Sequence, residues 1–242
     1  MDLFKSWLVE TPIAHRGYHS KTNPENSLSA FSKAIEKGYA IELDVQLLAD
    51  KTVVVFFDDS LARMTGNDGY VQYLNKEDLK ALTLKGSKEH IPTLEEALKL
   101  IDGRVPVMID IKTKYKVGEL EQAVIDILKN YKGEYAVQSL NPDSLKYFKQ
   151  HAPHILRGQV GGYLKGETIT WMKKRTIKTL NQNKKVSEPH FISYEASALP
   201  NRFVKRFKQL PLLAWTVRSK EEYLTVVKYC DNVIFEKFDP EI

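Results

Sequence analysis

Carboxylates and a lysine alternate with apolar residues in two short segments of the sequence. Glu42 and Asp44 are two positions apart in one segment, and Asp110 and Lys112 are two apart in the other. Successive side chains of a strand point to opposite faces, so each pair shares a face. Three carboxylates on inward faces would suit a hard cation such as Mg²⁺ or Ca²⁺. Ordinary ion pairs at solvent-exposed strand ends are the alternative interpretation.

His15 and Arg16 end the first apolar segment of the chain. Histidine titrates near neutral pH and suits proton transfer, and the planar guanidinium of arginine binds phosphate through two hydrogen bonds. With Lys112 and a divalent cation, they predict a site for phosphoryl chemistry. A histidine satisfied within the core is the alternative interpretation of His15 taken alone.

Nine strand-like segments position these residues, and helical segments separate most of them. The segments are Pro12–Arg16, Tyr39–Val45, Thr52–Phe57, Val105–Ile111, Tyr135–Leu140, Ile155–Val160, Phe191–Glu195, Leu212–Val217 and Val233–Glu236. Thr52–Phe57 follows its predecessor too closely for a parallel crossover, which predicts a hairpin strand. The turn at Asp50-Lys51 would place Phe57 across from Glu42.

The other eight strands predict an α/β protein with a (β/α)₈ TIM barrel. We expect a single domain over residues 1–242, with the extra hairpin strand and a long polar loop, to about Pro92, after strand 2. Its active site would lie at the carboxyl ends of the strands. An open doubly wound sheet is the alternative, although its usual glycine fingerprint is absent after the first strand.

Helices are expected between the strands. Asn26 or Ser27 would cap the first, Gly38 would end it, and Thr93 to Glu96 forms a capping box for the next. The remaining helical segments are Glu119–Tyr131, Ser144–His151, Thr168–Asn181, Asn201–Lys208 and Lys220–Tyr229.

Composition narrows the class of protein. The 242 residues are 43% hydrophobic, and no apolar run approaches the ~18 residues that span a bilayer. No secretory signal is visible, so we expect a cytoplasmic protein. The single cysteine, Cys230, excludes an intramolecular disulfide.

The net charge of +5 is concentrated in Lys165–Lys185, which holds seven basic residues and one acid. This segment predicts either a solvated helix face or weak contact with an anionic membrane. No recognised nucleic-acid-binding motif accompanies it, so we expect no nucleic-acid partner.

The sequence resembles the glycerophosphodiester phosphodiesterase family, which is related in fold to the phosphatidylinositol-specific phospholipases C. The matching stretches lie in family order along nearly the whole chain: Ile13-Ala14-His15-Arg16-Gly17, Asn23-Pro24-Glu25-Asn26-Ser27, Glu42-Leu43-Asp44-Val45, Val54 to Arg63, Ile91-Pro92-Thr93-Leu94, Ile109-Asp110-Ile111-Lys112 and Ala214-Trp215-Thr216-Val217. The resemblance implies a (β/α)₈ barrel. It also implies cleavage of a small glycerophosphodiester to glycerol 3-phosphate and an alcohol, with one divalent cation, Mg²⁺ or Ca²⁺.

The resemblance also implies residue roles. Glu42, Asp44 and Asp110 would hold the metal, although the family often has glutamate at the third position. Arg16 and Lys112 would hold phosphate, and His15 would be one of two catalytic histidines. Independently of the resemblance, the position of Trp215 on the seventh strand of the expected barrel makes it a candidate to line the substrate pocket, with a barrel-core role as the alternative.

The family's second histidine is replaced here by Phe57, which cannot carry a proton. Losing an acid or base typically lowers the rate by about 10²- to 10⁴-fold. The sequence therefore predicts either a slow phosphodiesterase or a phosphodiester-binding pseudoenzyme. His19 and His90 are the alternative proton carriers, and Glu25 is expected either near the metal or orienting Arg16.

Overall fold

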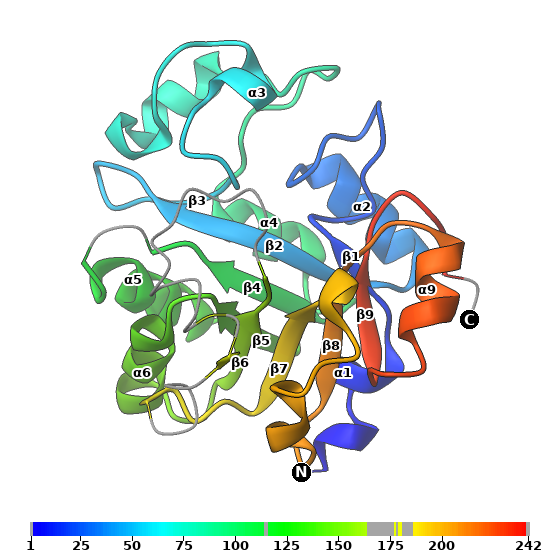
Figure 1. Ribbon diagram of the computed structural model, residues 1–242. Helices are drawn as coiled ribbons and strands as arrows, with labels where there is room; N and C mark the ends of the chain where they lie inside the picture. The colour runs from blue at the N-terminus through cyan, green and yellow to red at the C-terminus, as the bar shows by residue number, and fades with distance from the viewer. Residues whose placement is uncertain (1, 114–115, 164–176, 178, 181–185, 241–242) are drawn as a thin grey trace. The chain divides into compact units, whose positions relative to one another are not determined.

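The computed structural model describes residues 2–113, 116–163, 177, 179–180 and 186–240 (Figure 1). Its contacts divide the chain into two compact units. The central unit comprises Ala14–Tyr135, and the terminal unit combines Met1–Ile13 with Ala136–Ile242. The basic residues of the Lys165–Lys185 segment, and most of the helix expected at Thr168–Asn181, lie outside the described residues.

The central unit alternates strands and helices around one long buried strand, β2. Its elements are β1 (Ile13–His15), α2 (Leu28–Lys37), β2 (Ala40–Leu47), β3 (Val53–Val55), α3 (Ala62–Thr65), η2 (Val71–Tyr73), η3 (Lys76–Ala81), α4 (Leu94–Ile101), β4 (Val107–Ile111) and α5 (Glu119–Leu128). β4 pairs parallel to β2, and β3 pairs antiparallel to it with Val45 opposite Val55. The hairpin strand predicted after the Asp50-Lys51 turn is therefore confirmed, although the pairing ends at Val55 and does not include Phe57 and Glu42.

The terminal unit repeats parallel strands with helices between them. Its elements are η1 (Leu3–Lys5), α1 (Trp7–Glu10), β5 (Tyr135–Ser139), α6 (Pro142–His151), β6 (Leu156–Gly161), β7 (Phe191–Glu195), η4 (Ala196–Ala198), η5 (Val204–Phe207), β8 (Leu212–Val217), α9 (Lys220–Val226) and β9 (Asn232–Phe235). The strands pair in parallel in the order β5, β6, β7, β8 and β9.

Eight strands that alternate with helices, plus antiparallel β3, make the fold class a (β/α)₈ barrel, as the strand count predicts. Local caps also match the sequence. Ser27 accepts a hydrogen bond from the Ala30 amide at the start of α2, and Gly38 ends that helix in a left-handed conformation. Thr93 and Glu96 form the expected capping box of α4.

Two segments differ from the sequence prediction. Residues 58–92, expected as a polar loop, contain α3, η2 and η3 and pack their own apolar cluster, with Leu61, Val71 and Leu79 buried. Their apolar residues are too widely spaced to form a regular period, although they suffice to fill a small core. The helix expected at Asn201–Lys208 is only the short 3₁₀ turn η5.

None of the described helices is long and apolar enough to span a membrane.

Candidate active site

β2 carries the polar centre of the central unit. Ile41, Leu43 and Val45 are fully buried apolar residues, and the alternate positions Glu42 and Asp44 are each only 1% exposed. Period-two alternation puts these two carboxylates on one face of the strand, opposite the apolar residues.

A third carboxylate comes from the neighbouring strand β4. Asp110 lies opposite Asp44 in the parallel register, so the two side chains meet across the ladder. Carboxylate oxygens of Glu42, Asp44 and Asp110 all lie within 4.8 Å of one another, and all three residues are buried.

Two cations approach this carboxylate cluster. The Lys112 Nζ lies 2.9 Å from Oδ1 of Asp44 and 3.0 Å from Oδ2 of Asp110. The Arg16 Nε lies 3.0 Å from Oδ2 of Asp44, and Arg16 Nη1 donates to Glu25 Oε1 at 2.6 Å. Glu25 therefore orients Arg16, which was one of the two roles expected for it.

Arg16 owes its place to the turn after β1. Its backbone is left-handed at φ 57°, and its amide donates to Oε2 of Glu42 at 3.0 Å. Gly17 follows at φ 79°, and a Cβ there would lie 2.9 Å from Ala30 on α2. The turn therefore needs glycine both for its backbone conformation and for close packing.

The protonation of the cluster follows from burial and charge. Burial, then the Asp44 and Asp110 carboxylates, raise the pKa of Glu42 well above its usual value. Burial alone would also raise the pKa of Asp44, but the Lys112 and Arg16 cations outweigh it and lower that pKa below its ordinary value. Burial raises the pKa of Asp110 even though Lys112 opposes the shift.

These carboxylates fit a divalent cation. Three buried oxygen donors within one cluster match the ligands that Mg²⁺ and Ca²⁺ prefer. Three carboxylates face two cations, Lys112 and Arg16, so the fully ionised cluster carries an excess of negative charge. An added cation would relieve that excess and hold all three groups ionised.

His15 and Phe57 lie at the same cluster. The His15 Nε2 is 4.0 Å from Oε2 of Glu42. The Phe57 ring lies beneath both cations, with its centroid 3.6 Å from Cζ of Arg16 and 5.0 Å from Nζ of Lys112. An apolar ring therefore touches the two basic groups that were expected to bind phosphate.

Hydrogen bonds from Asn26 and Gln46 also position the site, and they were not predicted from the sequence. Asn26 Nδ2 donates to Oδ2 of Asp44 at 3.0 Å, and Gln46 Nε2 lies within hydrogen-bond distance of the backbone carbonyls of residues 56, 57 and 58. Gln46 continues the two-residue period of Glu42 and Asp44, a signal that could have identified it.

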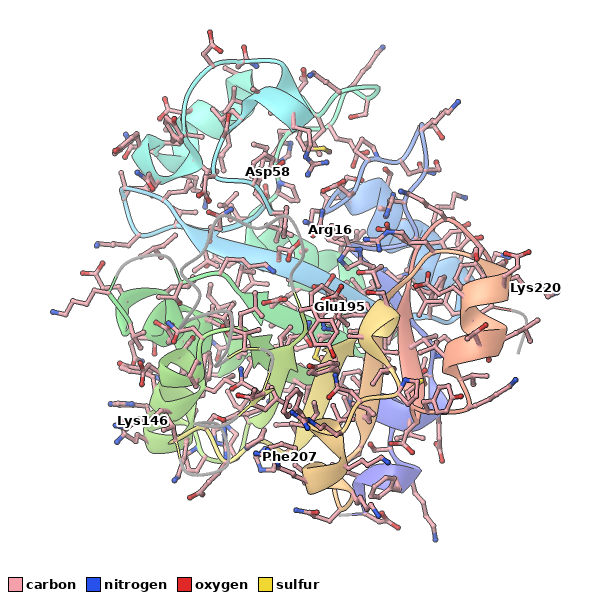
Figure 2. The ribbon with its side chains drawn as sticks, viewed as in Figure 1. Arg16, Asp58, Lys146, Glu195, Phe207 and Lys220 are labelled. Atoms are coloured by element: carbon pink, nitrogen blue, oxygen red, sulfur yellow. The ribbon has the colours of Figure 1, made fainter. Side chains whose placement is uncertain are left out.

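Arg63, on the segment after β3, also reaches this region. It binds both oxygens of Glu25 and pairs through Nε with Oδ2 of Asp58 at 2.7 Å. Arg16 and Asp58, both labelled in Figure 2, lie on the segments that follow β1 and β3. The position of Arg63 in the sequence does not indicate these contacts with Glu25 and Asp58, because they depend on how residues 58–92 fold.

Three further residues were expected at or near the site. The Trp215 side chain is on β8 of the terminal unit, where its indole N–H is buried without a hydrogen-bond partner among the described residues. His90 lies 3.4 Å from Glu96 at the start of α4. His19 follows the β1 turn, and a ring nitrogen of His19 lies within 4.8 Å of one of His15, so His19 is beside the site.

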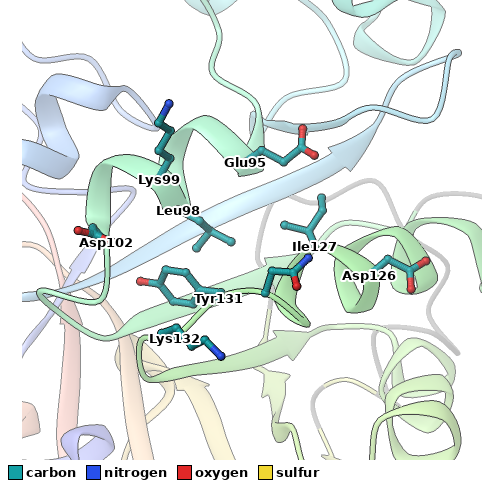
Figure 3. Close-up of a pocket in the computed structure, with 9 residues that line it drawn as sticks. Glu95, Leu98, Lys99, Asp102, Asp126, Ile127, Tyr131 and Lys132 are labelled. Atoms are coloured by element: carbon teal, nitrogen blue, oxygen red, sulfur yellow. The ribbon is translucent and has the colours of Figure 1, made fainter.

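A hollow of about 530 Å³ lies between α4 and the residues around the end of α5 (Figure 3). Its lining includes Leu98, Tyr131 and charges of both signs, such as Lys99 and Asp126. The buried carboxylates do not line it, so we assign it no part in the site.

Comparison with known proteins agrees with this arrangement. Residues 15–236 match the glycerophosphoryl diester phosphodiesterase family. A glycerophosphodiester phosphodiesterase of Caldanaerobacter subterraneus subsp. tengcongensis is 33% identical over 241 residues, which cover 95% of this chain and 94% of that protein.

Solved structures share the fold. An Oleispira antarctica phosphodiesterase in complex with the product sn-glycerol-3-phosphate has a TM-score of 0.78 and 25% identity, covering 94% of this chain and 93% of that one. A glycerophosphodiester phosphodiesterase of Thermotoga maritima has a TM-score of 0.71 and 27% identity, covering 93% and 94%. The chain belongs to the glycerophosphoryl diester phosphodiesterase family.

Proposed function

We propose that this protein is a divalent-metal-dependent hydrolase that cleaves glycerophosphodiesters to glycerol 3-phosphate and an alcohol. The observation that carries the proposal is the buried cluster of Glu42, Asp44 and Asp110 with Arg16 and Lys112 beside it. The cluster combines a hard-cation site with two phosphate-binding groups, which are the parts that phosphodiester cleavage needs.

Each side chain has a separate task in this proposal. Glu42, Asp44 and Asp110 hold Mg²⁺ or Ca²⁺, which when bound offsets negative charge on the phosphate and the reacting oxygens. Arg16 and Lys112 bind the phosphate oxygens. His15, beside Glu42, moves one proton during the reaction.

The second proton transfer is weakened because Phe57 stands where the resemblance places a second histidine. The Phe57 ring has no titratable group, so one oxygen of the diester gains or loses its proton without help from that position. Electrostatic stabilisation by the cations survives this change. The expected enzyme is therefore slow rather than inactive.

The comparisons support the substrate class. The related Oleispira antarctica enzyme was solved with sn-glycerol-3-phosphate, named there as its product. We extend this to the present chain because Arg16 and Lys112 offer the charges that a glycerol phosphate requires. Trp215, whose buried indole N–H has no hydrogen-bond partner in the part of the chain that the structure describes, is the proposed contact for the glycerol or alcohol part.

The test is release of glycerol 3-phosphate from glycerophosphocholine with Mg²⁺ or Ca²⁺. We expect slow turnover that stops with a chelator, and a rise of about 10²-fold or more in Phe57→His. Tyr73→His, which adds a histidine at an exposed position of the same segment, is the matched control and should leave the rate unchanged. An equal rate in wild type and Phe57→His would contradict the weakened proton step.

A second candidate function is binding of phosphodiesters without cleavage. The stacking of Phe57 on Arg16 favours it, because that contact occupies the position of a proton carrier with a group that only holds a cation. Calorimetry with intact glycerophosphocholine decides between the two functions. Tight binding with no turnover under either metal would replace the hydrolase proposal with this one.

A further inference from the structure

Phe57 contacts both cations of the site through the face of its ring. Its centroid lies 3.6 Å from Cζ of Arg16, a distance typical of a stacked guanidinium, and 5.0 Å from Nζ of Lys112. A cation over a ring face is attracted by the negative potential of the π-electrons.

Contacts on either side hold the backbone that carries this ring. Phe56 is 2% exposed and packs in the apolar cluster that includes Leu61, Val71 and Leu79. Gln46 Nε2 lies within hydrogen-bond distance of the Phe56, Phe57 and Asp58 carbonyls, at 2.8, 3.1 and 2.8 Å. Gln46 is itself 4% exposed, so this anchor lies away from solvent.

The edges of the Arg16 guanidinium are held by carboxylates. Asp44 lies 3.0 Å from Nε, and Glu25 accepts from Nη1 at 2.6 Å. Glu25 is in turn held by Arg63, which also pairs with Asp58, the residue after Phe57. The segment that carries the ring and the carboxylate that orients Arg16 are thus joined by the same arginine.

A ring and a carboxylate hold a cation in different ways. A carboxylate occupies N–H donors and offsets the positive charge. The N–H groups of a guanidinium lie in its own plane, so a ring stacked on its face leaves them for in-plane acceptors such as phosphate oxygens. A ring that holds one face also restricts the Arg16 side chain before an anion binds. Arg16 therefore loses less conformational freedom on binding.

We propose that Phe57 is a positioning residue of the anion site, whose ring holds Arg16, and more distantly Lys112, in the orientation that binds phosphate. The proposal rests on the proposed function, because it takes these two cations as the phosphate-binding groups. The ligand class is a phosphate monoester or diester of glycerol.

The experiment compares Phe57→Leu, which keeps an apolar side chain without a ring, with Phe57→Tyr, which keeps the ring. Tyr73→Leu removes an exposed aromatic from the same segment and is the control. The first readout is the NMR resonance of the Arg16 side-chain Nε–H, assigned by its loss in Arg16→Lys. The second is calorimetric affinity for glycerol 3-phosphate with Mg²⁺. Thermal melting of each variant verifies folding.

A stacked ring shifts the Arg16 resonance by its ring current. We expect that shift to disappear in Phe57→Leu and to persist in Phe57→Tyr. We expect affinity to fall about threefold to tenfold in Phe57→Leu, as for loss of one cation–π contact, and to stay near wild type in Phe57→Tyr and Tyr73→Leu.

The two proposals fail differently. If the wild-type protein binds no glycerol 3-phosphate with Mg²⁺, the proposed function fails, whatever the Arg16 resonance shows. If wild type binds it and Phe57→Leu binds equally well, Phe57 does not position the anion site. An Arg16 resonance that is the same in wild type and Phe57→Leu likewise overturns the proposal.

Discussion

At the residue scale, the site is defined by carboxylates that crowd one another. Burial and the nearby Asp44 and Asp110 raise the pKa of Glu42, while Lys112 and Arg16 lower that of Asp44 against the effect of burial. Three ionised carboxylates beside two cations leave the site with an excess of negative charge. This imbalance is the physical reason to expect a divalent cation there.

Asp110→Asn should weaken binding of Mg²⁺ or Ca²⁺ at least about tenfold. Even substitution of a residue that only hydrogen-bonds a metal ligand typically lowers metal affinity about 10- to 100-fold. The change removes one anionic oxygen donor while the side-chain shape is kept. Calorimetric titration with each metal measures the affinity. Asp126→Asn, which alters an exposed carboxylate paired with Lys129, is the control and should bind as wild type does. Unchanged affinity in Asp110→Asn would remove this residue from the proposed metal site.

At the element scale, β2 does more than carry two carboxylates. Its third inward polar residue, Gln46, bonds the chain just after β3 and so fixes the segment that bears Phe57. The same strand therefore sets the position of the carboxylates and of the ring that contacts the two cations. Both effects follow from the two-residue period of a strand, which places the side chains of residues 42, 44 and 46 on one face.

Gln46→Leu should lower the free energy of unfolding by about 1–3 kcal/mol, because it leaves buried carbonyls without their donor. Urea denaturation followed by circular dichroism measures the change. Gln122→Leu, at a helix position where the side-chain amide donates to Asp126 on the surface, should change stability by no more than about 0.5 kcal/mol. If both substitutions changed the free energy of unfolding equally, the Gln46 hydrogen bonds would not have the stabilising role given to them.

At the scale of the whole molecule, the terminal unit contributes a pH-sensitive contact to folding. The amide of Arg157 donates to Nδ1 of His190 at 3.0 Å, which requires that nitrogen to be unprotonated. Burial, with the positive charge of Arg157, lowers the pKa of His190 from 6.5 to about 4. The unfolded chain therefore takes up a proton below pH 6.5 that the folded chain refuses until about pH 4. Stability from this group is complete above pH 6.5 and is lost as the pH falls toward 4.

His190→Asn keeps an acceptor for the Arg157 amide but does not titrate in this range. Wild type should lose about 1–2 kcal/mol more stability than this variant between about pH 7 and about pH 5, after allowance for the partial exposure of His190. Urea unfolding at the two pH values measures the difference. His154→Asn, at an exposed histidine, should behave as wild type does. A parallel pH dependence in wild type and His190→Asn would contradict the role given to His190.

Strand positions, caps and the hairpin of β2 with β3 were accessible from the sequence because each depends on neighbours a few residues apart. The alternation of Glu42 and Asp44 with apolar residues predicted a shared face, and Ser27, Gly38 and the Thr93–Glu96 box marked helix ends. The family resemblance likewise needed only short motifs in order. The structure of residues 58–92 was missed because its helical turns rest on a small apolar core rather than on a local period.

The sequence by itself determined the fold class and the family, and it predicted that Phe57 stands at the position of a proton carrier. What the Phe57 side chain contacts was decided only by the tertiary structure. Arg16 and Phe57 lie far apart in the chain and on different loops, so their stacking depends on the packing of β2, β3 and the segment after β3. A sequence lists which groups are present, but attraction between a guanidinium and a ring acts only over a few ångströms. That distance exists only once the chain has folded.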